Sequence, residues 1–184
     1  MNFEEKILKL FKNGYLKTSS LTENNIPHFY LTKLVRENKI ERVARGLYIK
    51  KNNIADDFVI LQSKSKYAIY SNMTALYLLG YSERIPIKYD ITVISGYKGS
   101  LQGNDKVNLF YIKKDLLNIG VTNYKLNNAN LIRIYDLDKT ICDIIKNKNK
   151  VDNELFNKAI RQYYYSKDKN VLNLYNYAKK LRYL

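Results

Sequence analysis

The chain has 184 residues, of which 46% are hydrophobic and 27% are charged. This hydrophobic content excludes a wholly disordered protein, and the length allows one good core or two small ones. No apolar run approaches the roughly 20 residues that span a bilayer, so we expect no membrane partner. Glu4 and Glu5 stand where a signal peptide carries basic residues, and the single cysteine, Cys142, forbids an intrachain disulfide. We therefore expect a cytoplasmic protein.

The formal net charge of +15 favours a partner that carries negative charge, such as nucleic acid. Most of the basic residues are lysines in a chain that is also rich in Asn, Ile and Tyr. An AT-rich coding sequence produces this bias without selection for any partner. The distribution of charge is more informative, because the net charge is +5 in residues 1–50, +3 in residues 51–138 and +7 in residues 139–184.

Two helices are predicted at the start of the chain. Residues 2–13 form the first, with an apolar stripe on one face and acidic residues near its amino end. The second helix is short. Ser20 and Glu23 have the spacing of a capping box, which predicts the beginning of this helix, and Asn24-Asn25 predicts its end.

A third helix is predicted from Pro27 to Asn38. Proline suits the first turn of a helix, because its missing N–H would have had no intrahelical partner there. Leu31, Leu34 and Val35 recur at helical spacing and form the predicted buried stripe. The other side and the amino end carry the side chains that a partner would meet, which are His28, Phe29, Thr32, Lys33 and Arg36.

After Asn38 the hydrophobic period changes from helical to alternating, which predicts a β-hairpin with Ala44-Arg45-Gly46 at its tip. Three of the seven arginines, Arg36, Arg42 and Arg45, fall within ten residues. Arginine is the side chain that forks onto guanine edges and phosphates. Helix, turn, helix and basic hairpin is the order of a winged helix-turn-helix, in which the second helix of the motif enters the major groove of DNA.

Residues 1–50 are therefore predicted to be a winged helix-turn-helix domain that binds double-stranded DNA. We expect His28, Phe29, Thr32, Lys33 and Arg36 to face the major groove. Arg42, Arg45 and Lys50, on the hairpin, would hold phosphates or the adjacent minor groove. The alternative is an ordinary small helical domain with a solvated basic face, since helix-turn-helix patterns also arise by accident.

Residues 51–184 form the second predicted domain, a mixed α/β domain that ends in a helical bundle. Strands are predicted at residues 67–70, 89–95 and 107–112, with a hairpin between residues 121 and 135 and helices between the strands. The fold class of the whole chain is therefore predicted to be α+β.

From Asp136 onward the pattern predicts helices, whose buried residues include Ile145 and Val171. Basic and aromatic side chains interleave on the exposed faces of the last two helices. Such an arrangement can bind phosphates while stacking on bases, although a solvated lysine face is the commoner explanation. The residues of this predicted second basic surface are Lys158, Arg161, Lys179, Lys180 and Arg182.

We expect no metal and no cofactor. His28 is the only histidine, and Cys142 lies on an apolar helix, where a small buried side chain is the default. Asp136 and Asp138 could hold two metal ions, as the acidic pair of a nucleotidyltransferase does. In such enzymes a glycine–serine loop lies about ten residues before the pair, whereas 36 residues separate Ser100 from Asp136.

The acidic pair also stands where a helix cap is needed, so we predict capping for it and no enzymatic activity. A metal-dependent nuclease would need acids that converge on a sheet, and Asp90, Asp105 and Asp115 have no recognisable spacing.

Three stretches resemble one known family. They are residues 15–48, with Asn25-Ile26-Pro27 and Arg42-Val43-Ala44-Arg45-Gly46-Leu47-Tyr48; residues 134–143, Ile-Tyr-Asp-Leu-Asp-Lys-Thr-Ile-Cys-Asp; and residues 71–76, Ser-Asn-Met-Thr-Ala-Leu. In this order they resemble the AbiEi-type antitoxins of abortive-infection, type IV toxin–antitoxin systems. The second stretch has Asp138-Lys139 where that family more often has Glu-Arg.

The resemblance implies that the protein represses its own two-gene operon at inverted repeats. It also implies that the protein counteracts a nucleotidyltransferase-like toxin without a stable complex, through the carboxy-terminal domain. Asp138, Lys139, Thr140 and Asp143 match the family signature, and we expect them to cap and pack a helix. The alternatives are a plain winged-helix regulator whose second domain senses a ligand or a partner, and a DNA nuclease.

Overall fold

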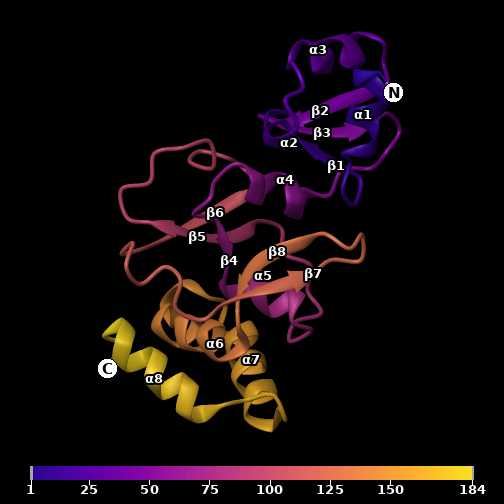
Figure 1. Cartoon of the computed structure of the whole chain (residues 1–184). Coiled ribbons are helices and arrows are strands. Elements are labelled where there is room, and N and C mark those ends of the chain that lie inside the picture. Colours follow the sequence, from indigo (N-terminus) through magenta and orange to yellow (C-terminus); the bar gives the residue numbers. More distant parts are fainter. Residues whose placement is uncertain (1, 184) are drawn as a thin grey trace. The chain divides into compact units, whose positions relative to one another are not determined.

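The computed structural model describes residues 2–183, and over this range the chain forms a mixed α+β fold with eight α-helices and two sheets (Figure 1). Contacts between residues divide the chain into two compact units. The first unit consists of the residues up to Lys64 together with Lys125–Ile132. The second unit consists of Ser65–Tyr124 and the residues from Arg133 onward. No helix in the described range combines the length and the hydrophobicity that crossing a bilayer requires.

The first unit contains a three-stranded antiparallel sheet in the order β1-β3-β2. Helices precede and interrupt the strands, and in chain order the elements are α1 (Phe3–Lys9), β1 (Tyr15–Lys17), α2 (Thr18–Glu23), α3 (Phe29–Arg36), β2 (Ile40–Ala44), β3 (Leu47–Lys50) and α4 (Asp57–Ser63). The core of this unit is formed by apolar residues of α1, β1, α2, α3 and β2, namely Ile7, Leu16, Leu21, Ile26, Leu31, Leu34 and Ile40.

Side-chain caps begin two of the helices of the first unit, α1 and α4. A capping box between Asn2 and Glu5 begins α1. The capping box predicted between Ser20 and Glu23 is wrong, because α2 already begins at Thr18 and no side chain caps it. Val35 was predicted to be buried with Leu31 and Leu34, but 38% of its surface is exposed.

The predicted hairpin is confirmed, since β2 and β3 pair with their turn at Arg45-Gly46. Gly46 has a φ of +73°, a conformation that glycine adopts without steric cost. The backbone N–H of Thr18, at the start of α2, donates a hydrogen bond of 2.9 Å to the carbonyl of Gly46. The tip of the hairpin is therefore attached to the helix that precedes α3.

The loop between two later strands also belongs to the first unit. Asn13 Nδ2 donates to the carbonyl of Ala129 over 2.8 Å, and Asn130 Nδ2 donates to the carbonyl of Asn13 over 3.0 Å. Asn128 Nδ2 bonds to Asp56, the residue that caps α4. The predicted first domain, residues 1–50, thus lies inside a unit that also contains α4 and Lys125–Ile132.

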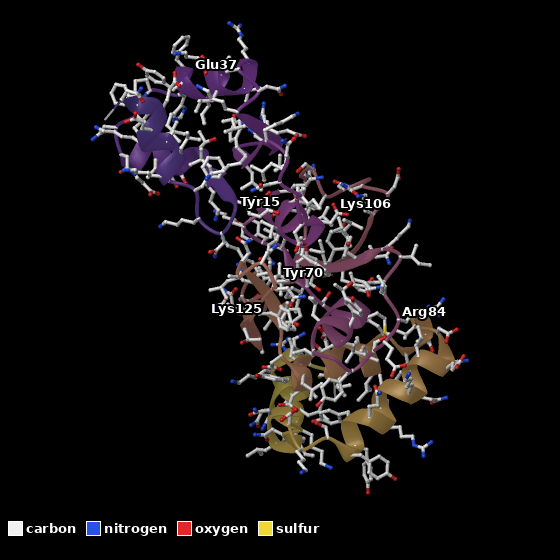
Figure 2. The ribbon with its side chains drawn as sticks, turned by 90° about the vertical axis from the view of Figure 1, so that its right-hand side faces the viewer. Tyr15, Glu37, Tyr70, Arg84, Lys106 and Lys125 are labelled. Atoms are coloured by element: carbon white, nitrogen blue, oxygen red, sulfur yellow. The ribbon has the colours of Figure 1, made fainter. Side chains whose placement is uncertain are left out.

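The second sheet has five strands in the order β6-β5-β4-β8-β7. Strands β5 and β6 are parallel, β4 pairs antiparallel with β5, and β4 pairs parallel with β8. Tyr70, on β4, is fully buried (Figure 2). The strand bounds are β4 (Ile69–Tyr70), β5 (Tyr89–Ile94), β6 (Val107–Ile112), β7 (Val121–Lys125) and β8 (Leu131–Tyr135), close to those predicted.

Helices of the second unit pack together around Leu76, Ile141, Ile144, Ala159 and Tyr163. Their bounds are α5 (Asn72–Leu78), α6 (Leu137–Lys146), α7 (Asn153–Tyr165) and α8 (Val171–Leu181), with a short 3₁₀ turn at Lys148–Lys150. Two residues predicted to be buried in these helices are exposed, Ile145 by 45% and Val171 by 61%. Ile145 lies next to the last residue of α6, and Val171 is the first residue of α8. The apolar pattern of each helix therefore continues to an end of the helix where the side chain is not covered by other elements.

Candidate nucleic-acid interface

The exposed face of α3 is formed by Phe29, Thr32 and Arg36, which follow one another at helical spacing. The opposite face carries Leu31 and Leu34, which are buried in the core of the first unit. This burial determines which side chains of the helix remain available to a partner. Phe29 is 67% exposed, a high value for a large apolar ring.

The two other residues predicted on α3 already have partners within the first unit. His28 immediately precedes the helix, and its Nε2 lies 3.1 Å from Thr22 Oγ1 on α2. Lys33 Nζ lies 2.5 Å from a carboxylate oxygen of Glu4 on α1 and 3.7 Å from one of Glu37. Lys33 is therefore on the flank of α3 that faces α1, and its charge is balanced there.

Glu4 and Glu37 form a network with Lys33 and Lys39. Lys39 Nζ lies 3.0 Å from Glu4 and 2.7 Å from Glu37, whose backbone ends α3. Hydrogen bonds from the two lysines lower the pKa of Glu4, and the same carboxylates raise the pKa of Lys33 and of Lys39. Two acids and two lysines cancel in formal charge, so Arg36 is the cation that the exposed face of α3 offers.

On the hairpin, the three predicted cations are exposed but lie at different distances from its tip. Arg42 Nε donates to the carbonyl of Ala44 over 3.3 Å, and Arg45 occupies the turn. Lys50 pairs across the sheet with Ile40 at the other end of the hairpin, and its ammonium lies 5.6 Å from the centre of the Phe11 ring. The structure therefore places Arg42 and Arg45 near the tip and Lys50 away from it.

Comparisons with known proteins establish no family for this chain. No family model matches it, and no curated protein is similar to it. Among solved structures, the fold is similar to that in the crystal structure of the Rv2827c protein from Mycobacterium tuberculosis, with a TM-score of 0.59 and 13% sequence identity. The match covers 90% of this chain and 66% of that chain, so it shows a shared fold and nothing further.

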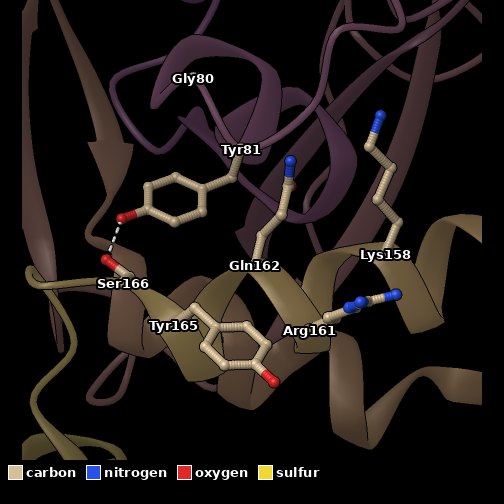
Figure 3. Close-up of a pocket in the computed structure, with 7 residues that line it drawn as sticks. All are labelled: Gly80, Tyr81, Lys158, Arg161, Gln162, Tyr165 and Ser166. Carbon is tan, nitrogen blue, oxygen red and sulfur yellow. Dashed lines mark hydrogen bonds between the residues drawn. The ribbon is translucent and has the colours of Figure 1, made fainter.

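The predicted second basic surface is divided between two cavities of the second unit. Lys158 and Arg161 project from α7 beside a cavity of about 500 Å³, next to Gln162 (Figure 3). Lys180 and Arg182 instead line a larger cavity, and Lys179 lines neither of them. Lys158 also lies 3.3 Å from Glu83. Two of the five residues thus line the smaller cavity and two line the larger one.

A hydrogen bond closes one side of the smaller cavity. The hydroxyl groups of Tyr81 and Ser166 bond to each other where the segment after α5 meets the end of α7 (Figure 3). Tyr165 and Gly80 complete the lining. This contact joins α7 to the segment after α5, whereas the larger cavity is lined by residues of α5, β5, β6, α6 and α8 and of the segments next to them.

Asp136 and Asp138, the acidic pair considered for catalysis, accept hydrogen bonds from neighbouring elements. Asp136 caps α6 by accepting from the backbone N–H of Lys139 over 2.8 Å, and it also accepts from the Tyr177 hydroxyl over 2.7 Å. Asp138 is buried and accepts from the Tyr163 hydroxyl and from a backbone N–H, each over 2.8 Å. The predicted cap is confirmed for Asp136. Asp138 lies in the first turn of α6 and accepts from Tyr163 of α7 and Asn170 before α8, contacts that the sequence did not predict.

Lys139 is fully buried and forms an ion pair with Asp143, one turn further along α6, at 2.5 Å. Its ammonium also lies 4.3 Å from the centre of the Tyr135 ring. The Tyr183 hydroxyl, beyond α8, donates to the same Asp143 oxygen over 3.2 Å. Burial raises the pKa of Asp143, against the opposing attraction of Lys139. The signature residues therefore hold helices together inside the unit.

Glycine at position 120 makes room for this lysine. Gly120 has a φ of +73°, and a Cβ atom there would lie 2.6 Å from Lys139 Cβ, closer than two carbon atoms approach. Cys142, on the same helix, is buried as predicted, and burial raises the pKa of its thiol to about 11. A thiol with so high a pKa is a poor nucleophile at neutral pH.

Sequence reasoning could not find the Glu4–Lys33 pair, because 29 positions separate these two residues and only the packing of α1 on α3 joins them. Among the residues that the structure describes, no three His, Cys, Asp or Glu side chains are grouped as metal ligands.

Replacing Lys139 by Met is expected to lower the free energy of unfolding by about 3–5 kcal/mol, because it leaves the Asp143 carboxylate buried without its cation. Chemical denaturation followed by circular dichroism measures this loss. Replacing both residues, with Lys139→Met and Asp143→Leu, should cost less than the single change. Lys146→Met, an exposed lysine on the same helix, is the control and should cost less than about 1 kcal/mol. Equal stability of Lys139→Met and the control would contradict the ionic role.

Proposed function

We propose that the first unit is a winged helix-turn-helix that binds double-stranded DNA. In this arrangement α2 and α3 are the helix-turn-helix, and the hairpin β2–β3 is the wing. The order of its elements and the sheet order β1-β3-β2 support this assignment. The observation that carries the proposal is the exposed face of Phe29, Thr32 and Arg36 on α3, followed directly by a hairpin with arginines near its tip.

The chemistry of these side chains suits a groove of DNA. Arg36 and Arg45 can each bond bidentately to a guanine edge or a phosphate, and the Thr32 hydroxyl can bond to either a base or a phosphate. Phe29 offers an apolar ring that can contact a thymine methyl group. Most of the affinity would come from phosphate contacts, and it would therefore fall as the salt concentration rises.

We further propose that the protein is an antitoxin and autorepressor of a type IV toxin–antitoxin operon. Its partners would be operator DNA, at inverted repeats, and a nucleotidyltransferase-like toxin that it antagonises without a stable complex. Support comes from the resemblance of residues 15–48, 71–76 and 134–143 to AbiEi-type antitoxins. Because the signature residues within residues 134–143 are buried, the antagonism would be exerted by other surfaces of the second unit.

The alternative is a winged-helix regulator whose second unit binds a ligand. Two cavities among the described residues of that unit are lined by basic residues, which favours this reading. The product of the neighbouring gene separates the two functions. An antitoxin should restore the growth of cells that express a toxic neighbour, and it should do so even with Arg36→Ala and Arg45→Ala, because these residues lie in the other unit. A neighbour without toxicity would exclude the antitoxin function and leave the regulator.

Replacing Arg36 and Arg45 together by Ala should weaken binding to the DNA upstream of the protein's own gene by at least about 30-fold, since each contact discriminates by about 1–3 kcal/mol. The magnitude of the negative slope of log affinity against log salt concentration should also decrease by about 2. Fluorescence anisotropy measures both quantities. Arg84→Ala with Lys98→Ala removes the same charge from exposed positions of the second unit and serves as the control. If both double variants weaken binding equally, the interface is elsewhere.

Lys33→Ala should weaken DNA binding less than Arg36→Ala at the same salt concentration, because Glu4 and Glu37 already balance the Lys33 ammonium.

Conversely, Glu4→Gln should strengthen DNA binding, because it removes a carboxylate that balances Lys33 and Lys39. The two lysines that contact Glu4 would then share Glu37 as their remaining carboxylate, which leaves one net positive charge beside the exposed face of α3. The same anisotropy titration tests each variant, and a larger loss for Lys33→Ala than for Arg36→Ala would refute this ordering.

A further inference from the structure

Two tyrosines at the end of α7 present their rings to solvent. Tyr164 is 66% exposed and Tyr165 is 73% exposed, whereas the residue before them, Tyr163, is buried. The centres of the two exposed rings lie 5.1 Å apart, and the ring planes are almost perpendicular, at 89°. Large aromatic groups that gather at the surface of a folded protein mark places where partners bind.

Packing on the opposite face of α7 determines which side chains point outward. Ala159 and Tyr163 belong to the core that α7 forms with α5 and α6. The Tyr163 hydroxyl also donates to the buried carboxylate of Asp138 over 2.8 Å. These contacts fix the rotation of the helix, so its outer face is a property of the fold and not of a mobile segment.

Two cations share the outer face with Tyr165. Lys158, Arg161 and Tyr165 stand three and four positions apart, so they lie in one row along α7 (Figure 3). All three line the smaller cavity of the second unit, which has a volume of about 500 Å³ and reaches Gly80. A Cβ atom built on Gly80 would contact no described residue within 4 Å beyond its chain neighbours, so this side of the cavity has room for a partner.

A third cation lies beside Tyr164. The Lys169 ammonium is 4.9 Å from the centre of the Tyr164 ring and donates to the backbone carbonyl of the same residue. Residues 158–170 contain four cations and a single acid, so the end of α7 and the segment after it are positively charged. Lys158 contacts Glu83 over 3.3 Å, but both side chains are exposed, and such a pair adds little and yields readily to another anion.

Cations and exposed rings in one row match the two parts of a single-stranded nucleic acid. Its phosphates carry the negative charge that Lys158 and Arg161 can bind, and its unpaired bases have open faces on which Tyr164 and Tyr165 can stack. In a duplex the neighbouring base pairs cover those faces, so the rings favour a single strand. The seven positions from Lys158 to Tyr165 span about 10 Å of helix, which corresponds to about three stacked nucleotides.

We propose that the end of α7 binds single-stranded DNA or RNA. Lys158 and Arg161 hold phosphates, and Tyr164 and Tyr165 stack on bases. An acidic protein would also meet these cations, but it would leave the bases' role to no group of its own. The surface lies in the second unit and does not rest on the winged-helix proposal, so either can fail without the other.

Fluorescence anisotropy with labelled single strands of about 12 nucleotides, one of DNA and one of RNA, tests the proposal. The full chain carries Arg36→Ala and Arg45→Ala, which removes the arginines of the proposed winged helix. The reference ligand is an abasic DNA strand of the same length, which has the phosphates and no bases. At low salt, the DNA or the RNA strand should bind at least about tenfold more tightly than the abasic strand and than a duplex of the same sequence. The tighter of the two strands identifies the class of nucleic acid.

Tyr165→Ala, added to the same chain, should weaken binding of that strand by at least about fivefold, because it removes one stacking ring. Binding of the abasic strand should change by less than about twofold. Tyr111→Ala, which removes an exposed tyrosine from β6 of the same unit, is the control and should change neither affinity by more than about twofold. Circular dichroism checks that each variant is folded.

Lys158→Ala with Arg161→Ala should instead weaken binding of both the abasic strand and the strand with bases, by at least about tenfold, because phosphates are common to the two ligands. Lys98→Ala with Lys114→Ala removes the same charge from exposed positions elsewhere in the unit and should change either affinity by less than about twofold.

Four results would each overturn the proposal. These are no binding of either single strand, binding of the abasic strand as tight as that of the strands with bases, tighter binding of the duplex, and equal losses for Tyr165→Ala and Tyr111→Ala. A surface that serves an acidic protein would give the second result, because its cations would attract phosphates whether or not bases are present.

Discussion

The ion pair between Lys139 and Asp143 is the interaction on which the second unit depends. Both groups are buried, so they lose their hydration, and only close pairing with further hydrogen bonds offsets that loss. Tyr183 supplies one such bond from beyond α8, and the Tyr135 ring lies under the ammonium. The pair therefore determines where the end of α8 lies, and with it the wall of the cavity that contains Arg182.

Pairing also decides which cations of the first unit remain available. Lys33 and Arg36 are three positions apart on α3, yet one faces Glu4 on α1 and the other lies on the exposed face. A surface pair of this kind adds little to stability. In the proposed complex with DNA, the pair would reduce the positive charge that the phosphate backbone meets at Lys33 and leave Arg36 and the hairpin arginines to provide it.

Local patterns predicted a large part of the fold. Gly46 marked the hairpin turn, and the acids at Asp136 and Asp138 marked the beginning of α6. Patterns failed where an element ends or where two signals compete. The apolar stripe of α3 was predicted to include Val35, but that side chain is partly exposed. The spacing of Ser20 and Glu23 fits a capping box, but both residues lie inside a helix that begins at Thr18. For the candidate site, the exposed side chains were predictable from helical period, but their ion-pair partners were not.

By itself, the sequence determined the order of most elements, the basic hairpin after α3 and the cap at the beginning of α6. These follow from hydrophobic period, turn residues and caps, which act over a few neighbouring positions. Tertiary structure alone decided the pairing of Lys33 with Glu4 and the division of the second basic surface. Each of these depends on which distant segments come within hydrogen-bonding distance, and that is set by packing between elements and not by the spacing along the chain.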